Sequence, residues 1–187
     1  MKIAFMGGSY DPPHYGHLIA AQQILGSGYG EVWLAPCAAN EFKKIIATPA
    51  QRMQMTRLAV KGLPGIVASD YDLKRNPSGD TVQTARLLKA DGIRADFVVG
   101  SDLVPQMRRW PRAPELFKEA KFLVFPRLPH ESKPRLPNAN FRFYPRAATV
   151  TSLNSTEVRQ RVKKGKTIAH LMPNAVAEFI RKNKIYQ

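Results

Sequence analysis

The chain has 187 residues and a formal net charge of +15, so it suits a single domain with an anionic partner such as a nucleotide, pyrophosphate or nucleic acid. No apolar run approaches the ~20 residues that a membrane-spanning helix needs, and no signal-peptide pattern precedes the first predicted strand, so we expect a cytoplasmic protein. The single cysteine, Cys37, excludes a disulfide framework within the chain and is expected to be a small buried side chain.

Short apolar runs alternate with helical patterns through the first hundred residues. The predicted strands cover 2–6, 31–35, 66–69 and 95–99, and the predicted helices cover 14–25, 49–61 and a segment that begins at Asp80 or Thr81. Residues 70–79 are polar and rich in turn formers, so we predict a loop there. Strands that alternate with helices favour parallel pairing and right-handed crossovers, which predicts a doubly wound α/β sheet.

The second half of the chain continues this pattern with one interruption. We predict a short helix within 111–117, a strand over 121–125 and a last short strand over 147–150. The stretch 126–145 between those strands holds five prolines and is expected to be extended. Residues 151–187 form a small helical C-terminal part of a single domain that spans 1–187.

The stretch 6–17 reads M-G-G-S-Y-D-P-P-H-Y-G-H and follows the first predicted strand directly. Glycines at its start allow backbone N–H groups, here those of Gly8 and Ser9, to approach a phosphate closely. His14 and His17 lie three residues apart, which places both imidazoles on one face of the first helical turn. The stretch fits neither G-x-G-x-x-G nor G-x-x-x-x-G-K-[ST], but it predicts an anion site at the carboxyl edge of the sheet.

A second motif, L-N-S-T-E-V-R, covers 153–159. Ser or Thr at a helix start leaves backbone N–H groups and a hydroxyl directed at an anion, and Arg159 lies on the same face as Ser155. A capped helix without a ligand has the same pattern, so this motif gains weight only together with the first loop.

The string H-Y-G-H at 14–17 resembles the H-x-G-H signature of the nucleotidyltransferase superfamily. The longer string over 7–18 resembles the nicotinate or nicotinamide mononucleotide adenylyltransferases. This resemblance implies a Rossmann-like nucleotidyltransferase fold and transfer of AMP from ATP to nicotinate mononucleotide, with release of pyrophosphate and formation of the deamido-NAD dinucleotide. It also implies Mg²⁺ bound through the ATP phosphates.

The resemblance assigns the phosphate-binding roles. It implies His17, His14 and Lys44 as catalytic residues, and its ATP-binding residues are Gly8, Ser9, His14, His17, Asn154, Ser155, Thr156 and Arg159. In the family a Pro-His-Lys string brings the lysine to ATP; here E-F-K-K at 41–44 lacks the histidine, and either Lys43 or the preferred Lys44 takes that part, or both are solvated. Arg52 matches the family's R-x-x-M and either reaches a phosphate or is solvated.

The resemblance also implies a mononucleotide site made by Asp80, Thr81, Thr84, Asp102 and Trp110. Trp110 follows G-x-D by the family's spacing and could stack on the pyridine ring, while Asp102 could accept a ribose hydroxyl. The alternatives are a core indole for Trp110 and a helix N-cap for Asp102. Gly79-Asp80-Thr81 replaces the family's Ser-Tyr-Thr, and the Asp80 carboxylate would repel a nicotinate carboxylate but tolerate an amide. Nicotinamide mononucleotide, or both mononucleotides, is therefore the alternative substrate.

Two more distant functions remain as alternatives. Phosphopantetheine adenylyltransferase shares the H-x-G-H signature. The charge of +15 also permits a nucleic-acid-binding protein on a nucleotide fold, although Lys and Arg are scattered and no aromatic residues interleave with a basic strip. The sequence leaves open whether the chain forms a homo-oligomer.

Overall fold

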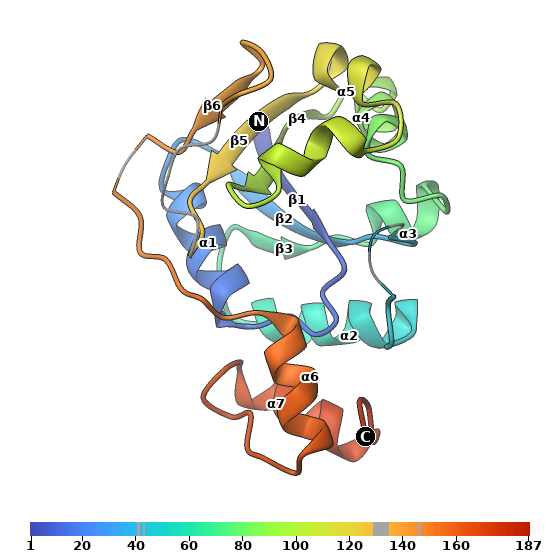
Figure 1. The fold of residues 1–187 in the computed structure, drawn as a ribbon, viewed down its shortest axis with the longest axis vertical. Coiled ribbons are helices and arrows are strands. Elements are labelled where there is room, and N and C mark those ends of the chain that lie inside the picture. Colours follow the sequence, from blue (N-terminus) through green and yellow to red (C-terminus); the bar gives the residue numbers. More distant parts are fainter. Residues whose placement is uncertain (41, 43, 129–134, 146) are drawn as a thin grey trace.

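The computed structural model describes residues 1–40, 42, 44–128, 135–145 and 147–187, and in these residues six strands form one sheet in the order β3-β2-β1-β4-β5-β6 (Figure 1). The strands are β1 (Lys2–Gly8), β2 (Glu31–Pro36), β3 (Ile66–Ala68), β4 (Arg94–Gly100), β5 (Lys121–Phe125) and β6 (Phe141–Phe143). All neighbouring pairs are parallel, which confirms the predicted doubly wound sheet. The strand order reverses between β1 and β4, and ligands bind at such a switch point.

Helices cover both faces of the sheet (Figure 1). They are α1 (Tyr15–Leu25), α2 (Pro49–Val60), α3 (Tyr71–Arg75), α4 (Thr81–Ala90), the 3-10 helix η1 (Val104–Arg109), α5 (Ala113–Glu119), α6 (Ser155–Lys163) and α7 (Asn174–Lys182). Among the described residues, none of these helices combines the length and apolar composition that crossing a bilayer requires.

The strands β1, β2, β4 and β5 supply both faces of the sheet with apolar side chains. Along β1, Ala4 and Met6 belong to one core and Ile3 and Phe5 to the other, because successive side chains of a strand point to opposite faces. The first core also contains buried residues of α1, α2, α6 and α7, so the C-terminal helices pack on the same face as α1. The predicted burial of Cys37 is confirmed.

The last predicted strand, 147–150, is wrong. The sixth strand is β6, inside the stretch expected to be merely extended; its Phe141 stacks on Phe122 of β5 with ring centroids 4.3 Å apart. Residues 147–150 are not a strand, and the backbone of Thr149 bonds to α1 instead: the Gln23 side chain accepts from the Thr149 N–H at 2.8 Å and donates to the Thr149 carbonyl oxygen at 3.0 Å.

The predicted loop 70–79 is also partly wrong, since it contains α3. This helix is too short to show a periodic apolar pattern, and a buried contact holds it: the Thr84 hydroxyl of α4 donates to Asp72 Oδ1 at 2.6 Å. Asp80, one of the two predicted caps of α4, is the N-cap, and its side chain accepts from the Val82 N–H.

Candidate functional site

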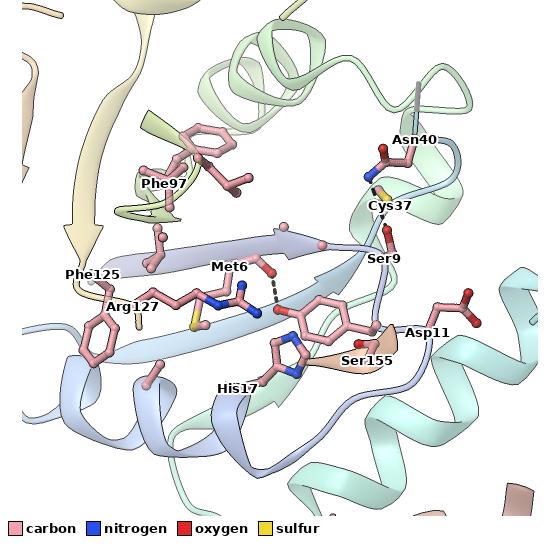
Figure 2. Close-up of a pocket in the computed structure, with 18 of the residues that line it drawn as sticks. Met6, Ser9, Asp11, His17, Cys37, Asn40, Phe97, Phe125, Arg127 and Ser155 are labelled. Atoms are coloured by element: carbon pink, nitrogen blue, oxygen red, sulfur yellow. Dashed lines mark hydrogen bonds between the residues drawn. The ribbon is translucent and has the colours of Figure 1, made fainter. Parts of the chain in front are cut away.

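A cleft of about 390 Å³ opens at the carboxyl edge of the sheet, beside the ends of β1 and β4 (Figure 2). Its walls include the loops after β1, β2, β4 and β5 and the first turns of α1, α4 and α6. The predicted site residues that line it are Gly8, Ser9, His14, His17, Lys44, Asp80, Thr81, Thr84, Trp110, Asn154, Ser155, Thr156 and Arg159. The fold therefore brings the two motifs from opposite ends of the chain to one cavity. Lys43 lies outside the described residues.

His14 and His17 stand side by side at the start of α1, with ring centroids 3.9 Å apart. The His14 backbone N–H donates to His17 Nδ1 at 3.2 Å, so the proton of a neutral His17 is on Nε2. Gly16 lies where a side chain would be crowded, because a Cβ there would lie 3.0 Å from the His14 ring and 3.2 Å from Thr151.

Both imidazoles are neutral at pH 7. Burial, followed by the charge of Arg127, lowers the pKa of His14 to about 3. Burial, then His14 and Arg127, lower the pKa of His17 well below its ordinary value. His14 is 2% exposed, and neither of its ring nitrogens has a hydrogen-bond partner among the described residues. A buried polar group in this condition is available to a ligand that enters the cleft.

Buried side chains hold in place the loop between β1 and α1, residues 9–14, here called the first loop. Asp11 accepts hydrogen bonds from the backbone N–H groups of Ile46 and Ala47, at 2.8 and 3.0 Å, and from the Tyr186 hydroxyl at 2.7 Å. Arg52 is fully buried and donates from Nη1 to the Ser9 carbonyl oxygen at 2.8 Å. The solvated alternative for Arg52 is therefore wrong; its contact is with the loop backbone.

The N-terminus of α6 meets the same loop. Asn154 is the N-cap and accepts from the Glu157 N–H. The Ser155 hydroxyl donates to the Pro12 carbonyl oxygen at 2.9 Å, and Arg159 Nη1 donates to the Asp11 carbonyl oxygen at 2.7 Å. These two side chains thus position the loop while they line the cleft. Ser155 and Thr156 begin α6, and the first N–H groups of a helix have no partner within it, which suits an anion.

Arg127 is a cleft residue that sequence reasoning missed. It follows the carboxyl end of β5, and its backbone N–H donates to the Ser101 hydroxyl at 3.0 Å. Figure 2 shows its side chain extending over the cleft floor toward His17. The sequence could have indicated this residue, because Arg127 lies two positions after a predicted parallel strand and such residues face the ligand-binding edge of the sheet.

A polar network that the sequence did not indicate supports the far wall. Asp72 is 4% exposed and lines the cleft, and burial raises the pKa of its carboxyl to about 6. Thr84 donates to Asp72, and the Asn76 amide donates to the Thr84 hydroxyl and the Asp80 carbonyl oxygen, both at 2.8 Å. Thr84 lines the cleft, but its hydroxyl hydrogen-bonds to Asp72 and Asn76 within this network.

Asp102 and Trp110 differ in placement. Trp110 lines the cleft and also packs against the second core, so it takes part in both. Asp102 is not among the described residues that line the cleft; its Oδ2 lies 3.7 Å from Arg127 Nη1. The N-cap alternative for Asp102 is wrong, because the N-cap of η1 is Leu103.

Comparison with known proteins gives one consistent family. The model of the Cytidylyltransferase-like family matches residues 5–161. A "Probable nicotinate-nucleotide adenylyltransferase" of Methylacidiphilum infernorum is 34% identical, over 99% of this chain and 92% of the relative. A protein of the same name from Hydrogenobaculum sp. is 33% identical, over 100% of this chain and 98% of the relative.

Solved structures agree with the fold. The Plasmodium falciparum nicotinic acid mononucleotide adenylyltransferase complexed with NaAD has a TM-score of 0.80 at 21% identity and covers 99% of this chain and 97% of its own. The same enzyme complexed with APC has a TM-score of 0.76 at 20% identity, over 99% and 96% of the two chains. At this identity the likeness concerns the fold.

Proposed function

The chain belongs to the cytidylyltransferase-like family and, within it, to the nicotinate-nucleotide adenylyltransferases, and from that premise we propose that the cleft transfers AMP from ATP to nicotinate mononucleotide. The products are pyrophosphate and the deamido-NAD dinucleotide. The observation that carries the proposal is that His14, His17 and the first turn of α6 line one cavity at the switch point of the sheet. The names of the relatives support the acid over the amide substrate.

The reaction is a displacement at phosphorus. An oxygen of the mononucleotide 5′-phosphate attacks the α-phosphorus of ATP, and the bond from that phosphorus to the bridging oxygen of the β-phosphate breaks. Pyrophosphate leaves with the bonding electron pair. Because the nucleophile is already an anion at neutral pH, the protein must position the reactants and stabilise charge, and no general base is needed.

The two histidines act on the transferring group. His17 donates from Nε2–H to an oxygen of the α-phosphate, because its Nδ1 is occupied by the His14 N–H. His14 supplies a second ring nitrogen to the same phosphates. Backbone N–H groups of Gly8 and Ser9 complete the cradle, and Arg127 adds positive charge beside the histidines, as its lowering of their pKa values indicates.

The β- and γ-phosphates lie at the N-terminus of α6. Backbone N–H groups of Ser155 and Thr156 point to them, and Arg159 contributes its charge from the same turn. Lys44, on the loop after β2, reaches them from the opposite wall. Asn154 acts as the cap that starts α6, so its role is to hold that turn in place.

Mg²⁺ enters with ATP as part of the substrate, bound through phosphate oxygens and water. In the part of the chain that the structure describes, no group of three or more His, Cys, Asp or Glu side chains is arranged to hold a metal ion. The charges that face the phosphates come from Lys and Arg side chains, and the neutral histidines add ring nitrogens without charge, which complements an anion that carries its own cation.

The pyridine mononucleotide occupies the wall between α4 and η1. Trp110 stacks on the pyridine ring, and the turn at Asp80 and Thr81 borders its substituent. Thr84 holds that turn through Asn76, and Asp102 acts on the ribose side through Arg127, which it contacts.

An assay of both products tests the proposal. The protein, ATP and Mg²⁺ are incubated with nicotinate mononucleotide, nicotinamide mononucleotide or phosphopantetheine. We expect equimolar pyrophosphate and deamido-NAD with nicotinate mononucleotide, a lower rate with the amide, and no turnover with phosphopantetheine. Absence of dinucleotide with nicotinate mononucleotide would contradict the proposal.

A further inference from the structure

The wall proposed for the pyridine substituent contains a carboxylate. Asp80 lines the cleft, and its side chain keeps 17% of its surface exposed. The proposed substrate brings a second carboxylate to this wall, and two like charges at short range oppose binding. A pocket selective for nicotinate therefore needs to offset the charge of Asp80.

The structure contains the group that does so. Asp80 Oδ1 accepts from the Val82 N–H at 3.0 Å, and Oδ2 lies 3.7 Å from Nη1 of Arg112. Arg112 is two residues beyond Trp110. It lies on the segment after η1, which faces the start of α4 across this part of the cleft. The ion pair thus joins the start of α4 to the segment that carries the stacking indole.

Arg112 is held in this orientation by its other nitrogens. Nε donates to Glu115 Oε1 at 3.1 Å and Nη2 to Glu115 Oε2 at 2.7 Å, which leaves Nη1 toward Asp80. This arrangement uses the planar fork of a guanidinium, and a lysine ammonium could not reproduce it.

Resting on the proposed function, we propose that Arg112 is a specificity-determining residue that lets this pocket accept the carboxylate of nicotinate beside Asp80. Without Arg112, Asp80 would lose its ion-pair partner, and Glu115 would keep only Arg86, which also pairs with Glu119. The unpaired carboxylate of Asp80 would repel the phosphate of both mononucleotides, but only nicotinate mononucleotide also carries a carboxylate on its ring. The ratio of kcat/KM for nicotinate mononucleotide to that for nicotinamide mononucleotide isolates this effect.

The test compares that ratio in the wild type, Arg112→Gln, Asp80→Asn and the double variant, with thermal unfolding as a check of folding. We expect Arg112→Gln to lower the ratio about three- to tenfold at low salt, and less at high salt because exposed charges are screened. Asp80→Asn keeps the α4 cap, since Asn caps as well as Asp, and should restore the ratio of the double variant to within about twofold of the wild type.

Arg86→Gln is the matched control, because Arg86 bonds Glu115 and Glu119 in the same network but is not the partner of Asp80. Its ratio should stay within about twofold of the wild type. If Arg112→Gln does not fold, Asp80→Asn alone decides, and it should raise the ratio about twofold or more. An unchanged ratio in Arg112→Gln, or an equal fall in Arg86→Gln, would overturn the inference, whereas a wild type inactive on both mononucleotides would overturn the proposed function instead.

Discussion

The hydroxyl of Ser155 donates a hydrogen bond to the carbonyl oxygen of Pro12, 143 residues earlier in the chain, at 2.9 Å. Together with the hydrogen bond from Arg159 to the Asp11 carbonyl oxygen, it fixes the first turn of α6 against the first loop. The groups from both ends of the chain that we propose to bind the anion therefore line one cleft and are held together by direct hydrogen bonds.

Replacement of His17 removes the ring nitrogen assigned to the transferring phosphate. We expect His17→Ala to lower kcat at least about 100-fold, a typical loss for one preorganised donor, while the fold is retained. His170→Ala, at an exposed histidine, is the matched control and should leave turnover unchanged. The measurement is steady-state pyrophosphate release together with thermal unfolding; near-normal turnover in His17→Ala would remove His17 from the mechanism.

Arg159 positions the first loop and lines the cleft, where we propose that its charge acts on the triphosphate. Arg159→Gln should raise the KM for ATP about tenfold or more, because a charge-assisted contact to phosphate and a support of the loop are lost together. Arg161→Gln is the control from the same helix, since Arg161 bonds the Thr167 carbonyl oxygen on the exposed side. Equal KM values for the two variants would show that Arg159 has no special role.

The Tyr186 hydroxyl links the C-terminal segment to the first loop through its hydrogen bond to Asp11, which is 2% exposed. Tyr186→Phe removes only the hydroxyl and should lower the free energy of unfolding by about 1–2 kcal/mol, because a bond to a buried carboxylate is lost. We expect kcat to fall as well, since the same carboxylate holds the loop after β2. Urea unfolding and pyrophosphate release measure both effects, with Tyr15→Phe as an exposed control. No loss of stability would contradict this coupling.

The buried carboxyl of Asp72 should make the free energy of unfolding depend on pH. Its carboxyl has a pKa of about 6 in the folded protein against an ordinary value of 3.8, so between these values the folded state binds more protons. The stabilising contribution of the Asp72 carboxyl is therefore fully present below pH 3.8, its ordinary pKa, and is lost as the pH rises through 6. From pH 4.5 to 7.5 the wild type should lose about 2 kcal/mol more unfolding free energy than Asp72→Asn. Parallel pH curves in urea unfolding would refute this.

The sequence predicted those parts of the fold that depend on local pattern. The strand over 121–125 has the predicted bounds because a continuous apolar run was buried on both faces. The two motifs at 14–17 and 153–159 also lie at helix starts as expected, since capping residues and helix N-termini are local features.

Features that depend on tertiary contacts could not be predicted in the same way. The Phe-Arg-Phe of β6 is too short to stand out among prolines, and only its pairing with β5 makes it a strand. Arg127 and Asp72 look like solvated charges in the sequence, and they become cleft residues because of what the fold places around them. Asp102 was expected in the cleft, but it is not among the described residues that line it; its carboxylate pairs with Arg127, which does line it.

We infer that the first loop and the N-terminus of α6 bind one triphosphate. A crystal structure of the protein with a nonhydrolysable ATP analogue and Mg²⁺ would show whether both contact the phosphates. We predict phosphate oxygens within hydrogen-bonding distance, about 3 Å, of both His17 Nε2 and the backbone N–H groups of Ser155 and Thr156. A triphosphate that contacts only one of these groups, or that binds outside the cleft, would contradict the account.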